Sequence, residues 1–376
     1  MSGIYFHIPY CRTKCHYCDF YASNNIKTIN QLVKAEVEEL SLRRSYLADE
    51  PVQTIYFGGG TPSVLSISHI NDLLSTVREN FNVSADCEIS LEANPEDLTE
   101  IYLKQLFEVG INRLSIGIQS FDEDILVYLG RRHGTQMLSN MVETAQNIGF
   151  HNISLDLIYG IPGLTLERYT ESIKEVLKLG VQHISAYALT IEKKTYFYKL
   201  LITNKLKEVA DEEVLDHFNA TIDLLALSGF SHYEVSSFSK PGFQSRHNSS
   251  YWQGKNYLGV GPAAHSFNGI SRQWNLSSTK NYILNIANGS PYFEVELLNE
   301  IDKYNEYVLL GLRTSNGISK NFIIDRFDKK IVSYFSKELL KLEKDEFILS
   351  SGDQICLSRK GILMADFIIR KLFYVP

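Results

Sequence analysis

Residues 7–20 read HIPYCRTKCHYCDF and place three cysteines, Cys11, Cys15 and Cys18, in the spacing C-x3-C-x2-C. Thiolates are the usual protein ligands of iron–sulfur clusters, so three of them on one short loop can hold a single [4Fe–4S] cluster. Such a cluster has four irons, and one iron is then left without a protein ligand, as is typical of a catalytic metal site. The spacing alone also allows a structural zinc site completed by His16, or three unrelated buried thiols.

Short apolar runs alternate with amphipathic stretches through the first half of the chain. The predicted strands are 4–8, 53–57, 88–92, 113–118, 153–158 and 183–189. The predicted helices are 29–47, 67–81, 98–109, 136–148 and 167–179. Repeated strand–helix alternation indicates a parallel sheet with helical crossovers. Six strands are too few for a closed eight-stranded barrel, so we expect an α/β fold built on a partial, TIM-like (βα)6 barrel.

Polar or glycine-rich groups follow five of the predicted strands. These groups are 11–18, the GGGTP sequence at 58–62, the EANP sequence at 92–95, Gln119-Ser120, and Asp156 near the end of its strand. Catalytic residues of βα barrels collect where the strands end. We therefore expect these groups to converge on one mouth of the barrel.

The sequence predicts three regions. Residues 1–230 form the barrel, 231–300 an aromatic and glycine-rich α+β extension, and 301–376 a small winged-helix-like domain. In this last domain we expect helices near 303–313, 319–327 and 330–342, a hairpin over 347–357 and a helix over 361–372. Residues 302–376 carry 13 basic and 10 acidic side chains, a weak excess that favours packing or partner docking over DNA binding.

Composition narrows the function classes further. The 376 residues carry a formal net charge of -7, which disfavours nonspecific binding to nucleic acid. Only five cysteines are present, so a disulfide-rich secreted scaffold is excluded, and we interpret Cys87 and Cys356 as buried apolar thiols. The opening residues do not read as a secretory signal, and no apolar run is long enough for a membrane span. We expect a cytoplasmic protein without an integral membrane segment.

The C-x3-C-x2-C loop after the first strand of a βα barrel resembles the radical S-adenosylmethionine superfamily. The resemblance implies that the methionine end of this cofactor chelates the open iron, beside the glycine-rich loop at 58–62. It covers the chain from Tyr5 to Gly163. The positions that match cofactor contacts in the related porphyrinogen oxidases are Tyr5, Gly59, Gly60, Thr61, Glu92, Gln119, Arg131 and Asp156.

The set closely resembles the oxygen-independent coproporphyrinogen III oxidases, with two departures. Their pattern has another cysteine at the position of Phe20, and they carry a long extension where only three residues precede Ile4 here. Both departures count against decarboxylase activity. The resemblance therefore leaves it open whether the protein is an enzyme.

Residues 247–252 read HNSSYW, which resembles the signature of the oxidase-like haem chaperones of the HemW type. The resemblance implies that His247, Tyr251 and Trp252 contact haem, with His265 as the rival axial ligand. A neutral histidine can ligate haem iron, and aromatic rings pack on the macrocycle. Without the resemblance, a histidine beside aromatic residues is more often hydrogen-bonded packing.

Three hypotheses follow from the sequence. The first is a haem chaperone on a radical S-adenosylmethionine scaffold, which delivers haem to apo-haemoproteins, uses an electron donor and has at most peripheral membrane contact. The second is an oxidase that decarboxylates the propionates of coproporphyrinogen III to give protoporphyrinogen IX. The third, a DNA-binding regulator with an iron–sulfur sensor, rests on the C-terminal helices alone.

Overall fold

Six parallel strands form the centre of the structure, a computed structural model that describes residues 2–376. Each strand lies beside the next one in the sequence, in the order β1 to β6. The strands are β1 (Ser2–Ile8), β2 (Val52–Gly59), β3 (Val83–Ala93), β4 (Arg113–Gln119), β5 (Ile153–Tyr159) and β6 (His183–Ala188). This arrangement confirms the predicted α/β fold with helical crossovers.

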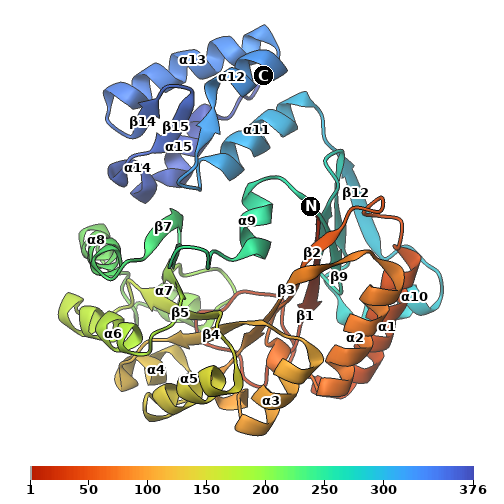
Figure 1. The fold of residues 1–376 in the computed structure, drawn as a ribbon. Coiled ribbons are helices and arrows are strands. Elements are labelled where there is room, and N and C mark those ends of the chain that lie inside the picture. Colours follow the sequence, from red (N-terminus) through yellow and green to blue (C-terminus); the bar gives the residue numbers. More distant parts are fainter. Residues whose placement is uncertain (1) are drawn as a thin grey trace.

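Helices cover the outside of the curved sheet (Figure 1). They are α1 (Ile29–Leu42), α2 (Ile67–Asn80), α3 (Glu100–Val109), α4 (Glu123–Leu129), α5 (Gln136–Ile148) and α6 (Leu166–Lys178). Short 3-10 turns precede three of them, at Ile26–Thr28, Pro62–Val64 and Pro95–Asp97. The side chains of Ser66, Thr99 and Thr165 cap the first turns of α2, α3 and α6. Gly110 ends α3 with a φ of 106°, in the left-handed region where glycine is favoured.

Strands from the extension lengthen the same sheet at both edges. Beside β1 lies β9 (Asn256–Val260), also parallel, followed by antiparallel β10 (His265–Phe267), β11 (Ser271–Asn275) and β12 (Phe293–Leu297). Beyond β6 lie antiparallel β8 (Ser237–Ser239) and β7 (Ser231–Glu234). Two helices, α7 (Tyr196–Ile202) and α8 (Asp211–Leu227), lie between β6 and β7. Two more, α9 (Arg246–Trp252) and α10 (Thr279–Ala287), lie in the extension. Residues 231–300 therefore complete the barrel sheet instead of folding beside it.

A buried carboxylate joins this extension to the barrel. Glu39, on α1, accepts hydrogen bonds from the Gly261 amide at 2.9 Å and from Asn275 Nδ2 at 2.8 Å. The Tyr282 hydroxyl of α10 donates a third at 2.5 Å, and Arg43 lies 3.4 Å away. Burial raises the pKa of Glu39, while Arg43 and these donors lower it. A buried carboxylate needs such partners, so this network fixes the β9–β11 edge against α1.

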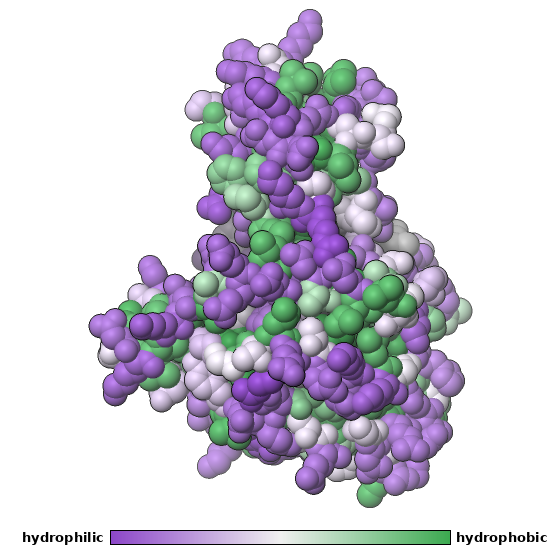
Figure 2. Space-filling view, turned by 90° about the vertical axis from the view of Figure 1, so that its left-hand side faces the viewer, coloured by the Kyte–Doolittle hydropathy of each residue, from purple (hydrophilic) through white to green (hydrophobic). Residues whose placement is uncertain are grey.

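The C-terminal domain has a separate hydrophobic core, with Tyr304, Val308 and Phe335 among its buried residues. Its three-stranded sheet has the order β13-β15-β14. The elements are α11 (Glu300–Gly311), β13 (Ile318–Ser319), α12 (Lys320–Arg326), α13 (Lys329–Lys344), β14 (Ile348–Ser351), β15 (Gln354–Leu357), α14 (Arg359–Leu363) and α15 (Ala365–Leu372). Figure 2 shows this domain standing on the broader barrel, with a mostly hydrophilic surface on this face.

Backbone hydrogen bonds and an ion pair attach the domain to the barrel. The Val235 amide donates to the Arg313 carbonyl, and the Ser315 amide donates to the Tyr233 carbonyl, each at 3.0 Å. The Arg359 side chain reaches α8, where it lies 2.7 Å from an Asp223 carboxylate oxygen. These contacts attach the domain at the β7–β8 edge of the sheet and at α8, and a second ion pair, between Arg272 and Glu306, joins β11 to α11.

Three sequence predictions were wrong in detail. The helix predicted over 29–47 ends at Leu42, and residues 43–49 form turns in which Ala48 and Asp49 have positive φ. The helix predicted over 361–372 breaks at Met364 into α14 and α15. Cys87 is buried as expected, but Cys356 is only half-buried, with its thiol 3.2 Å from the Ser315 carbonyl oxygen. Within residues 2–376, no helix has the length and apolar character of a membrane span.

The Phe6→Ala change should lower the free energy of unfolding of the barrel by about 3–5 kcal/mol, because it leaves a cavity in the core. The Phe6 ring is fully buried and stacks on Phe57 at 4.8 Å between centroids. The matched control is Phe20→Ala, whose ring is 65% exposed and should cost well under about 1 kcal/mol. Urea unfolding followed by circular dichroism checks both. Equal losses in the two variants would contradict the buried position of Phe6.

Candidate functional site

The three cysteines of the 11–18 loop are free thiols, all half-buried, at the C-terminal end of β1. The Thr61 hydroxyl donates a hydrogen bond to Cys11 Sγ at 3.3 Å. The Arg131 guanidinium donates to Cys15 Sγ at 3.4 Å. The loop therefore lies against the residues that follow β2 and against the segment after α4.

His16 anchors the far side of this loop. Its Nδ1 lies 2.9 Å from the Tyr128 carbonyl oxygen, and its backbone amide donates to the Leu129 carbonyl at 3.1 Å. Its own carbonyl accepts from the Phe197 amide at 3.0 Å. These contacts give His16 a structural part in seating the loop between α4 and α7. Among residues 2–376, no three His, Cys, Asp or Glu side chains surround a common single-ion position.

Arg131 links the cysteine loop to the ends of two strands. Besides Cys15, its guanidinium donates to Asn94 Oδ1 at 2.7 Å and to the Gly117 carbonyl. Its Nε is buried and has no hydrogen-bond partner among the residues described. A buried cation beside a thiol, with a donor still unused, fits an added group that is rich in negative charge and acceptors. Three free thiols with this cation beside them fit an iron–sulfur cluster.

The glycine loop after β2 makes room for a close backbone approach. Gly59 has a φ of 109°, and a Cβ there would lie 2.9 Å from the His7 ring. A Cβ on Gly60 would lie 2.8 Å from the Tyr10 carbonyl oxygen. Neither position tolerates a side chain, so the loop packs tightly on the strand that carries the cysteines.

Glu92 is the last residue but one of β3 and lies beside this loop. It accepts a hydrogen bond from the Tyr56 hydroxyl at 2.8 Å and another from the Gly59 amide at 3.2 Å. Burial raises the pKa of Glu92 to about 7, an effect that these two hydrogen bonds oppose. Near neutral pH this carboxyl group exists in both protonation states, so it can accept or donate hydrogen bonds to a hydroxyl-bearing ligand.

Asp156 and Gln119 lie farther along the same rim. The Ser115 hydroxyl lies 3.4 Å from each carboxylate oxygen of Asp156, and burial raises the Asp156 pKa to about 6. Gln119 has a φ of 65°, and the β4–β5 register shifts between Gly117 and Gln119. Such backbone strain in a residue other than glycine is concentrated at functional sites.

A cavity of about 340 Å³ opens at this rim. Its lining brings together three of the predicted cofactor positions with two of the histidines and several aromatic rings. The lining residues are Tyr5, His7, Phe20, Gly59, Glu92, Tyr251, Tyr257, Ala263 and His265. The predicted residues Gly60, Thr61, Gln119, Arg131 and Asp156 lie outside this lining, along the neighbouring strand ends and the cysteine loop.

His247 lies on α9 with both ring nitrogens hydrogen-bonded. Its Nδ1 lies 2.9 Å from the Thr54 hydroxyl and its Nε2 lies 2.8 Å from the Tyr251 hydroxyl. Its ring stacks on Tyr56 at 4.9 Å, and its backbone amide donates to Glu88 at 3.0 Å. Burial lowers the His247 pKa to about 3, so the ring is neutral.

The HNSSYW motif is divided between two cavities. Tyr251 lines the cavity at the rim, whereas Trp252 lines a second cavity of about 930 Å³ between the barrel and the C-terminal domain. His265, the rival haem ligand, is exposed at the rim cavity. The structure thus separates residues that the sequence places side by side.

Asn94, Tyr56 and His7 also belong to the site, although the sequence predicted no individual part for any of them. Asn94 contacts both Arg131 and Thr61, at 2.7 and 3.3 Å. His7 Nδ1 lies 3.1 Å from the Tyr5 hydroxyl. The period of two in β1, where Ile4, Phe6 and Ile8 are buried, places Tyr5 and His7 on the opposite face and was a usable signal.

Comparison with known proteins agrees with this geometry. Residues 5–176 match the Radical SAM superfamily, and residues 298–364 match the HemN C-terminal domain. The Heme chaperone HemW of Bacillus subtilis is 34% identical over 370 residues, which cover 97% of each chain. The Heme chaperone HemW of Escherichia coli is 37% identical over 266 residues, covering 70% of this chain and 69% of its own. The solved coproporphyrinogen III oxidase (HemN) of Escherichia coli superposes with a TM-score of 0.85 at 25% identity, covering 99% of this chain and 90% of that one.

The partial barrel and its cysteine loop define a radical S-adenosylmethionine protein, a class that uses a [4Fe–4S] cluster and S-adenosylmethionine. Within that class, the chain belongs to the Heme chaperone HemW family, as full-length identities of 32–34% to relatives from three bacterial genera establish.

Replacing Glu92 with glutamine should flatten the pH dependence of stability. The folded-state pKa of about 7 lies above the ordinary 4.5, so the folded protein holds the proton more tightly. Protonated Glu92 therefore adds to the free energy of unfolding. This contribution is complete below pH 4.5 and is lost as the pH rises to about 7, a loss of about 3 kcal/mol. Asp156, whose pKa is also raised, adds the same pH dependence of stability to the wild type and to Glu92→Gln.

Urea unfolding of the cofactor-free proteins between pH 5 and pH 8 measures the difference. The wild type should lose more stability over this range than Glu92→Gln. Parallel curves for the two proteins would show that Glu92 carries an ordinary pKa.

Proposed function

We propose that this protein binds haem and passes it to apo-haemoproteins, on a scaffold that also holds a [4Fe–4S] cluster and S-adenosylmethionine. The observation that carries the proposal is the likeness to the Bacillus subtilis Heme chaperone HemW over 97% of each chain. The proposal includes a cytoplasmic site of action, an apo-haemoprotein acceptor and an electron donor.

The cysteine loop would hold the cluster through Cys11, Cys15 and Cys18. In this arrangement Arg131 offsets the negative charge at Cys15, and the Thr61 hydroxyl does the same at Cys11. When bound, the cluster and cofactor supply one-electron reductive cleavage of the sulfonium. The buried guanidinium keeps the loop seated on β3 and β4 through Asn94 and Gly117.

The rim would hold S-adenosylmethionine through the residues that the resemblance selects. We assign to it Tyr5, Gly59, Gly60, Thr61, Glu92, Gln119, Arg131 and Asp156. Gly59 and Gly60 admit close backbone approach, and Glu92 offers oxygens for ribose hydroxyls. The Tyr5 hydroxyl orients His7 at 3.1 Å, and burial raises the Tyr5 pKa, so this phenol stays protonated.

We assign haem contacts to the HNSSYW motif, in which the histidine and the two aromatic residues would make different kinds of contact. Ligation of iron by His247 requires its ring to give up the hydrogen bond to Thr54 or to Tyr251. His265 carries no such bonds among the described residues and is the more accessible imidazole. Tyr251 and Trp252 supply aromatic surface, each to its own cavity.

A second candidate function is oxidative decarboxylation of coproporphyrinogen III. The observation that favours it is the superposition on the Escherichia coli HemN oxidase over nearly the whole chain. Phe20, which is exposed at the rim where the oxidase pattern has a cysteine, counts against it. Formation of protoporphyrinogen IX in an anaerobic assay with S-adenosylmethionine and a reductant would place this activity above the chaperone function.

Changing Cys15 to serine should abolish the broad visible absorbance of the cluster after anaerobic reconstitution, because a thiolate ligand is lost. The matched control is Cys87→Ser, which alters a buried thiol on β3 and should leave iron and sulfide content unchanged. Iron and sulfide are measured together with the absorbance. A full cluster in Cys15→Ser protein would refute the ligand assignment.

Titration of the cluster-loaded protein with hemin should give a saturable Soret shift at one equivalent. A Soret maximum that moves in His265→Ala would assign the axial imidazole to His265 at the rim. His247→Ala should mainly lower stability, because Thr54 and Tyr251 lose a buried partner. A Soret maximum that moves only in His247→Ala would assign the axial imidazole to His247, and no stoichiometric binding by the wild type would refute the proposed function.

A further inference from the structure

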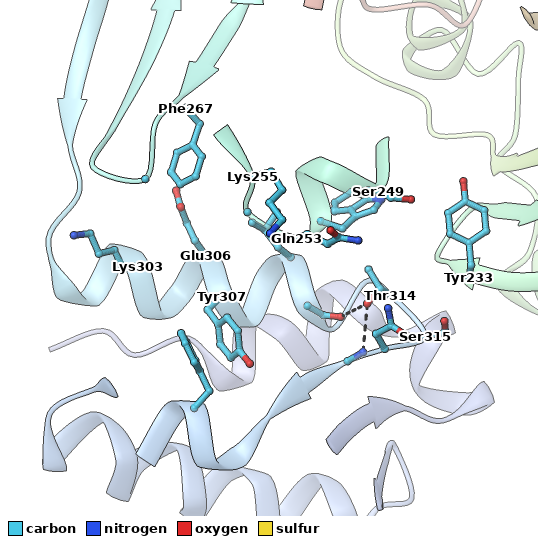
Figure 3. A pocket seen from close by; sticks show the side chains of 18 of the residues that line it. Tyr233, Ser249, Gln253, Lys255, Phe267, Lys303, Glu306, Tyr307, Thr314 and Ser315 are labelled. Atoms are coloured by element: carbon cyan, nitrogen blue, oxygen red, sulfur yellow. Dashed lines mark hydrogen bonds between the residues drawn. The ribbon is translucent and has the colours of Figure 1, made fainter. Parts of the chain in front are cut away.

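The cavity of about 930 Å³ lies between α9 and α11, at the junction of the barrel and the C-terminal domain (Figure 3). On its barrel side Figure 3 shows Lys255 and Phe267, and α11 contributes Lys303 and Glu306. Trp252 also lines it from α9. This cavity is separate from the rim cavity, with which it shares no lining residue.

The two cavities lie toward opposite ends of the barrel strands. The start of β1 faces α9 and α11, whereas the cysteine loop follows its last residue, Ile8 (Figure 1). A seven-residue strand spans roughly 20 Å. The buried His247 ring packs against the start of β1, 3.4 Å from the position that a Cβ on Gly3 would take. A ligand in the cavity beside α11 would therefore be held apart from the cysteine loop.

Two lysines give this cavity uncommitted positive charge. Within residues 2–376, the side-chain ammonium groups of Lys255 and Lys303 have no hydrogen bond and no ion pair. The other charged residues of the lining are already paired, Arg246 with Asp86, Arg326 with Glu300, and Glu306 with Arg272. The cavity therefore fits a ligand with two negative groups.

Aromatic side chains supply the remaining surface. The rings of Tyr233, Trp252, Phe267, Tyr307, Phe322 and Phe327 line the cavity. The Trp252 Nε1 is buried and has no hydrogen-bond partner among the described residues, which is costly for an indole donor. A large, mainly apolar ligand that also carries acceptor groups would use both features.

We propose that this cavity is the haem site, with one propionate at Lys255, the other at Lys303, and Trp252 against the macrocycle. The proposal rests on the proposed function and adds the location and the recognition of the cargo. Haem matches the site because it combines a large apolar face with two carboxylates. Trp252 lines a different cavity from Tyr251, and this proposal gives it a direct contact with haem.

The test is hemin binding by full-length, cluster-loaded protein that carries Lys255→Glu and Lys303→Glu together. The dissociation constant should rise at least tenfold over the wild type, because the propionates would face two carboxylates. The matched control is Lys34→Glu with Lys207→Glu, two exposed lysines outside the cavity, which gives the same net charge. This control should bind hemin as the wild type does. Cluster absorbance and circular dichroism report whether each variant folds.

Hemin dimethyl ester, in which both propionates are neutral, gives the second measurement. The wild type should bind the diester as weakly as the double variant binds hemin, and the double variant should lose nothing further with the diester. Unchanged hemin affinity in the double variant overturns the site, and so does a diester that binds the wild type as tightly as hemin.

The result also distinguishes this proposal from the function on which it rests. A wild type that binds no hemin refutes both. A wild type that binds hemin through the rim, with affinity lost in His265→Ala and retained in the lysine variant, overturns the cavity assignment and leaves the haem-binding function standing.

Discussion

The parallel pairing of β1 on both of its sides is the constraint on which the rest of this structure depends. β1 pairs with β2 on one side and with β9 on the other, so a strand of seven residues is held by backbone hydrogen bonds along both edges. Its alternate residues Ile4, Phe6 and Ile8 are fully buried. The other face carries Tyr5 and His7 into the rim cavity, and the chain then enters the cysteine loop. Register and alternation thus fix three parts of the site at once.

Around β1, the polar groups of the site are arranged as a chain of contacts between strand ends. Arg131 connects Cys15 to Asn94 and Gly117, and Asn94 continues to Thr61 and so to Cys11. These side-chain contacts link segments that are far apart in the sequence, so they hold the cysteine loop and the strand ends of the rim in place relative to one another. Such a network preorganises a metal-binding loop by seating it on the sheet.

The charged side chains at the two ends of the barrel differ in sign and in burial. At the rim, burial raises the pKa of Glu92 to about 7 and that of Asp156 to about 6, so both carboxyl groups hold a proton more tightly than exposed acids do. At the junction with the C-terminal domain, Lys255 and Lys303 retain unpaired charge beside a set of aromatic rings. The rim suits a polar cofactor with hydroxyl groups, and the junction suits an apolar dianion. Buried His247, neutral and bonded on both nitrogens, lies between them.

Much of this protein followed from the sequence alone. The strand–helix alternation predicted the parallel sheet, and the cysteine spacing predicted the loop that follows β1, because local periodicity and short-range spacing do not depend on tertiary contacts. The helices α4, α7, α9 and α10 and the strands at the edges of the sheet were missed because elements of nine residues or fewer are too short to show a clear period. Only the tertiary structure assigned the HNSSYW motif to two cavities, since a helix of seven residues directs neighbouring side chains to different faces. It alone also paired Arg246, Arg326 and Glu306 and left the side chains of Lys255 and Lys303 without an ion pair among residues 2–376, because ion pairs between distant segments form only when the chain has folded.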